Sequence, residues 1–139
     1  MTDSLALDML KRHEGYRQKP YHCTAGKLTV GYGRNLDDVG LTVDEAEYLL
    51  KQDINRAVLS LQALKCWLTL DSVRRAVLID MHVNLGNAGL MKFKKFLAAV
   101  ERQDYDAAAD EMQASMWYRQ VRIRAAELTQ MMRTGQTKG

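Results

Sequence analysis

The part of this chain that most constrains its fold is a short segment, between Tyr21 and Tyr32, that favours β-strand. Tyr21, Tyr32 and the run from Lys27 to Val30 include the β-branched and aromatic residues typical of strands. Thr24-Ala25-Gly26 suits a tight turn between them. Beyond Gly33 the pattern predicts helices almost to the end of the chain. We therefore expect an α+β, mostly helical protein with one small β-hairpin.

The segment before the hairpin predicts a short helix that ends beside it. Its apolar residues recur at helical spacing, and Asp3 or Ser4 is placed to cap its N-terminus. Gly15 is suited to end the helix, because glycine readily adopts the conformation of a helix C-terminus. Glu14 is therefore expected at the junction of helix and hairpin.

Several further helices are expected after the hairpin. Thr42 and Glu45 form a capping box that opens a long amphipathic helix. At 1.5 Å per residue, a helix of about 22 residues spans roughly 33 Å, which is long enough to bridge two lobes. Asp71 is placed to cap the next helix, Gly86 to end it, and Asn87-Ala88-Gly89 predicts a break. The later helical segments are expected at 90–100, 104–112, around Trp117 and at 122–132.

The length of the chain fits one domain with a sizeable core. We expect a single domain over 1–139, with a hairpin lobe over about 14–40 and a bridging helix over about 42–64. A helical lobe over about 71–133 is expected to include the N-terminal helix as well. No run of about 18 apolar residues occurs, and the start of the chain lacks the basic flank and apolar core of a signal peptide. Neither a signal peptide nor a membrane span is expected.

Cysteine, histidine and charge narrow the classes of function. Cys23 and Cys66 are too few for a disulfide framework, so both are expected as free thiols in a reducing cytoplasm. The three histidines are scattered singly without ligand spacing, so neither a metal nor another cofactor is expected. The net charge of +3 suits nucleic acid, but equally an anionic polymer such as a bacterial cell wall. Arg and Lys form no dense arm, so nucleic-acid binding is not expected.

The residues best suited to take part in catalysis are Glu14, Cys23 and Thr29, which are separated by eight and then five residues. Taken singly, a Glu at a helix end is usually a solvated charge, and a lone Cys is usually a small buried apolar residue. Their context changes this expectation. A three-residue turn keeps Cys23 and Thr29 close, with Thr29 opposite Cys23 across the hairpin. An acid on the helix is then expected to face both groups across a cleft, and the glycines of Gly31-Tyr32-Gly33 indicate a bend or a close backbone approach.

The same spacing, followed by Gly31-Tyr32-Gly33, resembles the motif of the phage-type lysozymes, the T-even phage endolysin family. In that family Asp or Cys occupies the middle position. Later segments resemble the family's landmarks in the same order, at Thr42 to Glu47, Asp71 to Ala76, Asn84-Leu85-Gly86 and Trp117 to Gln120. The resemblance covers nearly the whole chain. It implies a lysozyme-like fold, with a small hairpin lobe joined by a long helix to a larger helical lobe.

The resemblance also implies an activity. The expected reaction is hydrolysis of the β-1,4 bond between N-acetylmuramic acid and N-acetylglucosamine in bacterial peptidoglycan, for host cell lysis. Glu14 would be the general acid. Thr29 would hold the attacking water on the opposite face, which predicts inversion, whereas a covalent route through Cys23 would give retention. Two roles stay open for Cys23, because it can act as a thiolate or as a group that only positions water.

Other site residues follow by matching the family position by position. Arg124 matches an Arg that pairs with the catalytic Glu, so an Arg124–Glu14 contact is expected. Asn84 matches a polar residue that hydrogen-bonds sugar. Arg34 stands where a relative has a His paired with an Asp, and Asp53 matches that Asp, so an Arg34–Asp53 ion pair is expected to support the site. The remaining residues expected to bind substrate are Leu28, Tyr32, Trp117 and Gln120.

Two other functions stay open at this point. The first is a cell-wall-binding or interaction protein that kept the cleft but lost turnover through Cys23. The second is a small basic nucleic-acid-binding protein, which would show a steep salt dependence of binding. For the muramidase, the expectation is a monomer without membrane insertion. It would be made in the host cytoplasm and reach peptidoglycan after a membrane lesion such as a holin makes.

Overall fold

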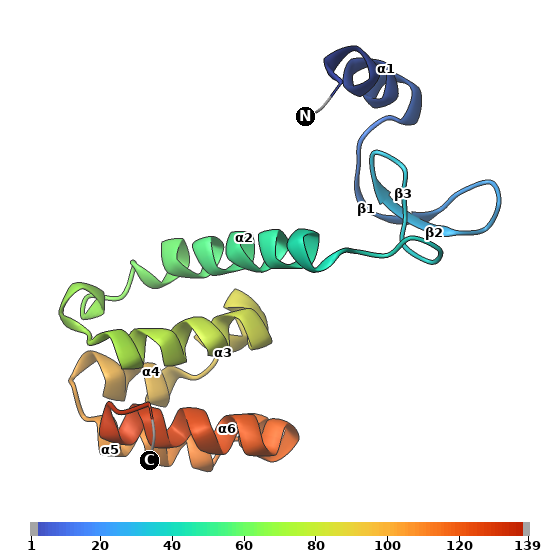
Figure 1. Cartoon of the computed structure of the whole chain (residues 1–139). Coiled ribbons are helices and arrows are strands. Elements are labelled where there is room, and N and C mark those ends of the chain that lie inside the picture. Colours follow the sequence, from blue (N-terminus) through green and yellow to red (C-terminus); the bar gives the residue numbers. More distant parts are fainter. Residues whose placement is uncertain (1–2, 138–139) are drawn as a thin grey trace. The chain divides into compact units, whose positions relative to one another are not determined.

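The computed structural model describes residues 3–137, so the two residues at each end of the expected 1–139 domain lie outside the described part. Two compact units meet in the sequence between Leu49 and Leu50. The first contains α1 (Ser4–Glu14) and a three-stranded antiparallel sheet (Figure 1). Its strands are β1 (Arg17–His22), β2 (Leu28–Gly31) and β3 (Arg34–Asn35). The boundary falls inside α2 (Val43–Leu61), and the second unit continues with η1 (Trp67–Thr69), α3 (Ser72–Met91), α4 (Lys94–Glu101), α5 (Tyr105–Gln113) and α6 (Met116–Thr134). The expected α+β, mostly helical fold is confirmed.

The first helix has the expected start and end. The Asp3 carboxylate accepts a hydrogen bond from the Ala6 N–H at 3.2 Å, so Asp3 is the N-cap. The helix ends at Gly15, whose φ of 72° is readily adopted only without a Cβ. α1 falls in the first unit, whereas the sequence assigned it to the helical lobe. That assignment concerns how the two units meet and stays a prediction.

The register of the small sheet determines which residues lie opposite each other on the two sides of the expected turn. Thr24 to Gly26 is closed by a hydrogen bond from the Cys23 N–H to the Lys27 carbonyl at 2.9 Å. The residue directly opposite Thr29 is Tyr21, so the expectation that Cys23 lies opposite Thr29 is wrong. Cys23 lies two residues beyond Tyr21 and is a diagonal neighbour of Thr29 on the same face, which still permits contact. β3 was not expected, and it pairs with β2 on the side away from β1.

The expected capping box opens α2. The Thr42 N–H donates to Glu45 Oε1 at 2.9 Å, and the Glu45 N–H donates to Thr42 Oγ1 at 3.1 Å. The helix ends at Leu61, earlier than the expected end near residue 64. Beyond it, the carboxylate of Glu101 accepts hydrogen bonds from the backbone N–H groups of Lys65 and Cys66. These bonds hold the chain in a turn instead of a further helical turn.

The breaks in α3 are partly where the sequence placed them. Asp71 caps the helix by accepting from the Arg74 N–H at 3.0 Å, as expected. Gly86 interrupts it, with a φ of 76° and a ψ of 166°. The expected break over Asn87 to Gly89 is wrong, because the chain is helical again up to Met91 and the next helix, α4, begins at Lys94 instead of residue 90. A Cβ at Gly89 would lie 3.1 Å from the Leu85 Cβ, so this glycine allows close packing.

The second unit has a continuous apolar core. α5 packs against α4 and α6, and α3 packs against α6 (Figure 1). Asp104 and Ser115 cap α5 and α6 as expected, and Arg122, with a φ of 41°, interrupts α6. Within residues 3–137 no helix combines the length and apolar character needed to cross a bilayer. The largest fully buried side chains are Phe96, Leu61, Leu78, Met81, Leu90, Met112, Met132, Val77 and Val100.

Arg74 joins the start of α3 to the end of α6. Its Nε donates to the Met132 carbonyl at 2.7 Å and its Nη2 to the Arg133 carbonyl at 3.1 Å, groups that lack helical partners at a C-terminus. The guanidinium also lies 3.7 Å from the ring centroid of Tyr105.

Replacing Arg74 by Ala is therefore expected to lower the free energy of unfolding by about 2–4 kcal/mol, because charge-assisted hydrogen bonds and a cation–π contact are lost together. Denaturant unfolding monitored by circular dichroism measures this loss. Arg102→Ala is the matched control. Within residues 3–137 the Arg102 side chain makes only an exposed ion pair, with Asp104, so its loss should change stability by less than about 0.5 kcal/mol. Equal effects of the two variants would contradict the role of Arg74.

Candidate active site

Glu14 is the last residue of α1, and its exposed carboxylate lies against the backbone of Gly33. A Cβ at Gly33 would lie 2.5 Å from Glu14 Oε2 and 2.9 Å from its Cδ, closer than real side chains approach. Gly33 also has a φ of 78°. The close backbone approach expected from Gly31-Tyr32-Gly33 is thus confirmed, and it places the carboxylate just beyond the end of β2.

Gly33→Ala is expected to impair the Glu14 carboxylate more than the fold. The new methyl group would displace the carboxylate, and alanine at positive φ adds a strain of about 1–2 kcal/mol. If the protein hydrolyses peptidoglycan as the sequence predicts, the rate should fall at least tenfold, with unfolding still cooperative. Gly26→Ala is the control, because Gly26 has a similar φ of 77° but nothing within 4 Å of its Cβ position. Equal losses of activity in both variants would show that backbone strain alone is responsible.

Thr29 is buried in β2, with 3% of its surface exposed. Its hydroxyl donates to the Lys27 carbonyl oxygen at 2.8 Å. A hydroxyl has one hydrogen and two lone pairs, so this bond leaves Thr29 Oγ1 free to accept. The orientation suits a group that accepts a hydrogen bond from water.

Cys23 is a partly exposed free thiol directly after β1. Its pKa is lowered, chiefly by hydrogen bonding from the Lys27 backbone N–H, then from that of Ala25, with a smaller contribution from the Thr29 hydroxyl. The Thr29 hydrogen is already donated to the Lys27 carbonyl, so the backbone groups are the main stabilisers of a thiolate. The structure therefore brings Cys23 and Thr29 together and favours ionisation of the thiol.

Arg34 has a different partner from the one expected. Its Nη1 donates to Glu45 Oε1 at 2.7 Å and to the Gly40 carbonyl at 3.1 Å, and Asp53 pairs instead with Arg56. The expectation that Arg34 pairs with Asp53 is therefore wrong. Thr42 holds Glu45 at the start of α2, two helical turns before Asp53, and Arg34 pairs with this nearer carboxylate.

The Arg34–Glu45 pair has a defined pH range. Hydrogen bonding from Arg34 is the main cause that lowers the pKa of Glu45 to about 2. A carboxyl with a lowered pKa contributes stability that is present above its unfolded pKa of about 4.3 and is lost as pH falls toward about 2. The pair thus joins β3 to the first turn of α2 throughout the neutral range.

Two predicted residues of the second unit contact each other. The Trp117 indole Nε1–H donates to Asn84 Oδ1 at 2.8 Å, and Trp117 is 3% exposed with its ring edge-on to Phe93. The indole can only donate, so the Asn84 oxygen faces Trp117 and its NH₂ group is left available on an exposed side chain. Trp117 therefore orients Asn84. Binding of substrate by either residue stays a prediction.

The remaining predicted residues lie as follows. Arg124 Nε donates to Asp80 Oδ1 at 2.7 Å within the second unit. The expected Arg124–Glu14 contact would join the two units and stays a prediction. Sequence reasoning missed Asp80, although its position one turn before Asn84 on α3 was an available signal. Gln120 is exposed, Leu28 is partly buried in β2, and Tyr32 is half-exposed just after β2.

A small antiparallel sheet followed by a mostly helical unit is consistent with a lysozyme-like fold. The family model "Phage lysozyme" matches residues 11–133, and the chain belongs to this family. Peptidoglycan is the substrate that membership implies.

Several known proteins are similar to this chain, each over a different share of its length. Probable T4-type lysozyme 2 of Dictyostelium discoideum is 30% identical over 99% of this chain and 98% of its own length. The pre-baseplate central spike protein Gp5 of Enterobacteria phage T4 is 27% identical over 92% of this chain, which spans 27% of that protein. An endolysin of Acyrthosiphon pisum secondary endosymbiont phage 1 is 46% identical over 34% of this chain and 35% of its own length.

Proposed function

We propose that this protein is an endolysin-like muramidase that hydrolyses the β-1,4 bond between N-acetylmuramic acid and N-acetylglucosamine in bacterial peptidoglycan with inversion. The observation that carries the proposal is that three groups lie along or just beside β2. Glu14 lies against Gly33, just beyond the strand, and Thr29 within the strand lies beside Cys23. Family membership over residues 11–133 supports the same conclusion.

In the proposed mechanism Glu14 protonates the leaving glycosidic oxygen. Bond cleavage generates positive charge on the sugar ring while the departing oxygen gains negative charge, so a proton donor on that oxygen lowers the barrier. Gly33 lacks the Cβ that would overlap the Glu14 carboxylate, so the carboxylate can lie against the backbone just beyond β2. Such positioning is the protein's contribution to an acid-catalysed step.

The water that attacks the sugar is proposed to bind at Thr29 and Cys23. Thr29 Oγ1 already donates to the Lys27 carbonyl, so it would accept one hydrogen of the water. The Cys23 thiolate would accept the other and take the proton as the water attacks. With both hydrogens engaged, a lone pair of the water points to the sugar carbon, and attack from the face opposite Glu14 inverts its configuration.

The released sugar tests this proposal. Purified protein is incubated with peptidoglycan, and the new reducing ends are reduced and analysed. Muramitol is expected, because cleavage frees the reducing end of N-acetylmuramic acid. The first anomer detected by proton NMR should be α, whereas a β product would indicate a covalent intermediate on Cys23. Glucosaminitol in place of muramitol would overturn the proposed bond specificity.

The setting in which the enzyme acts is part of the same proposal. We propose that it acts as a monomer and accumulates in the host cytoplasm, and that it reaches the wall after a holin-type lesion permeabilises the membrane. The similarity to an endolysin over 34% of the chain supports a role in lysis. Fractionation of expressing cells before and after membrane permeabilisation tests it. Lysis of expressing cells whose membrane has not been permeabilised would contradict the requirement for a lesion.

A further inference from the structure

Three tyrosines from separate segments of the first unit are unusually exposed. Tyr16 follows α1, Tyr32 follows β2, and Tyr48 lies in α2, with exposed fractions of 65%, 49% and 63%. The ring centroids of Tyr16 and Tyr32 lie 5.7 Å apart. The Lys11 ammonium lies 5.8 Å from the Tyr32 centroid. These contacts orient the Tyr32 ring without burying it.

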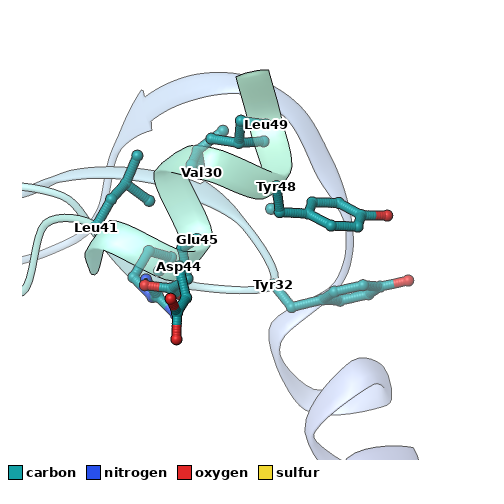
Figure 2. Close-up of a pocket in the computed structure, with 9 residues that line it drawn as sticks. Val30, Tyr32, Leu41, Asp44, Glu45, Tyr48 and Leu49 are labelled. Atoms are coloured by element: carbon teal, nitrogen blue, oxygen red, sulfur yellow. The ribbon is translucent and has the colours of Figure 1, made fainter. Parts of the chain in front are cut away.

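Tyr32 and Tyr48 border a hollow of about 460 Å³ that lies wholly within the first unit. Figure 2 shows their rings pointing the same way, with both hydroxyl oxygens at the same end. Three aliphatic side chains also line the hollow, and its volume is within the range typical of small-ligand sites, about 300–1,000 Å³. Those aliphatic residues are Val30, Leu41 and Leu49.

The charges at the hollow favour an uncharged ligand. Arg34 and Glu45 line it but neutralise each other as an ion pair. Asp44 also lines it, and among the described residues it has no ion-pair partner. A single unneutralised carboxylate disfavours phosphates and acidic peptides, and it accepts hydrogen bonds from hydroxyl groups.

Sugar rings match this combination of surfaces. A pyranose has apolar C–H faces that pack on aromatic rings, and hydroxyl groups around its edge that bond to polar groups. Tyrosine offers both an apolar ring and a polar tip, so paired tyrosines suit such a ligand. The aliphatic side chains, the two aromatic rings and the one free carboxylate together suit a neutral saccharide.

The hollow also lies close along the chain to residues of the candidate active site. Tyr32 is the residue directly before Gly33, which contacts Glu14, and Val30 directly follows Thr29. A glycan strand held at Glu14 continues for many sugar rings beyond the bond that is cleaved. Such a strand is long enough to contact further surfaces of the same unit.

We propose that Tyr32, Tyr48 and Asp44 form an auxiliary subsite that binds an N-acetylhexosamine ring of the peptidoglycan strand, away from the cleaved bond. The subsite rests on the proposed muramidase function and adds to it a way of holding polymeric substrate. It predicts that loss of Tyr48 weakens binding and raises KM for whole peptidoglycan while kcat is nearly unchanged. Glu14→Gln should instead lower kcat.

The first experiment uses the Glu14→Gln protein, so that turnover does not consume the ligand. Chitotriose is titrated while methyl signals are followed by NMR, and the methyls of Val30 and Leu49 are expected to shift whereas those of Leu59, exposed elsewhere on α2, are not. Adding Tyr48→Ala should weaken binding to chitotriose and to sedimented peptidoglycan by about 3- to 10-fold, the range expected for one lost aromatic contact.

Two variants separate this role from a structural one. Tyr48→Phe keeps the ring and should retain most of the binding, and Leu59→Ala is the control for an exposed α2 substitution with no expected effect. Unshifted Val30 and Leu49 methyls, or undiminished binding in Tyr48→Ala, would overturn the subsite while lysis by the wild type keeps the muramidase proposal intact. A wild type that neither binds nor lyses peptidoglycan would refute the proposed function itself.

Discussion

Replacing Glu14 by Gln is expected to lower the rate of peptidoglycan hydrolysis by about 10²- to 10⁴-fold, the usual contribution of a general acid. Glutamine has nearly the same shape as glutamate, so it should occupy the same place against Gly33. It has no proton of suitable acidity to give to the leaving oxygen. The loss should therefore appear in kcat, whereas binding to sedimented peptidoglycan should be retained.

The control for this variant is Glu47→Gln, which removes an exposed carboxylate from α2 in the same unit. It should clear a suspension of peptidoglycan at the wild-type rate. Melting temperatures of all three proteins exclude unfolding as the cause of any loss. Retention of more than half of the wild-type activity by Glu14→Gln would remove Glu14 from the mechanism.

The second large effect is expected at Cys23. If the thiolate takes the proton of the attacking water, Cys23→Ser should lower activity by about 10²-fold or more, because a hydroxyl of similar size is a far weaker base. Wild-type activity should rise with pH through the pKa of Cys23, which its backbone hydrogen bonds place below that of an ordinary thiol.

The Cys23→Asp variant tests whether the pH dependence of the activity comes from ionisation of the side chain at position 23. A carboxylate is ionised at much lower pH than a thiol, with an ordinary pKa of about 3.9, so this variant should lose the alkaline dependence and remain active in mildly acidic buffer. Rates of peptidoglycan clearing from about pH 5 to 9 distinguish the variants. A Cys23→Ser protein that clears walls as fast as wild type would show that the thiol serves only to position water.

The parts of the fold that could be predicted are those in which local sequence determines local geometry. Thr42 and Glu45 form their capping box, and Asp71 caps α3, because both motifs lie within one helical turn. The interruption at Gly86 followed from the same kind of signal. Gly89 was misinterpreted because its reason for being glycine is packing against Leu85, which no pattern of neighbouring residues indicates.

The candidate site shows the same division. The spacing of Cys23 and Thr29 around a turn predicted their proximity, although register places Tyr21 directly opposite Thr29. The partner of Arg34 was mistaken, because a long side chain near a helix start can reach several acids, and the one already fixed by Thr42 pairs with it. Strand β3 was missed because two residues, Arg34 and Asn35, carry no alternating pattern.

The interruption of α6 at Arg122 lies between two hydrogen bonds that α6 makes to α3. The part of α6 before it fixes Asn84 through Trp117, and the part after it fixes Asp80 through Arg124. Asp80 and Asn84 lie one turn apart on α3, so α6 holds a single turn of α3 at two points. A change at any of these four positions leaves a hydrogen-bonding group without its partner. The two hydrogen bonds act on the same turn, so we expect the effects of variants at Trp117 and Arg124 on the free energy of unfolding not to be additive.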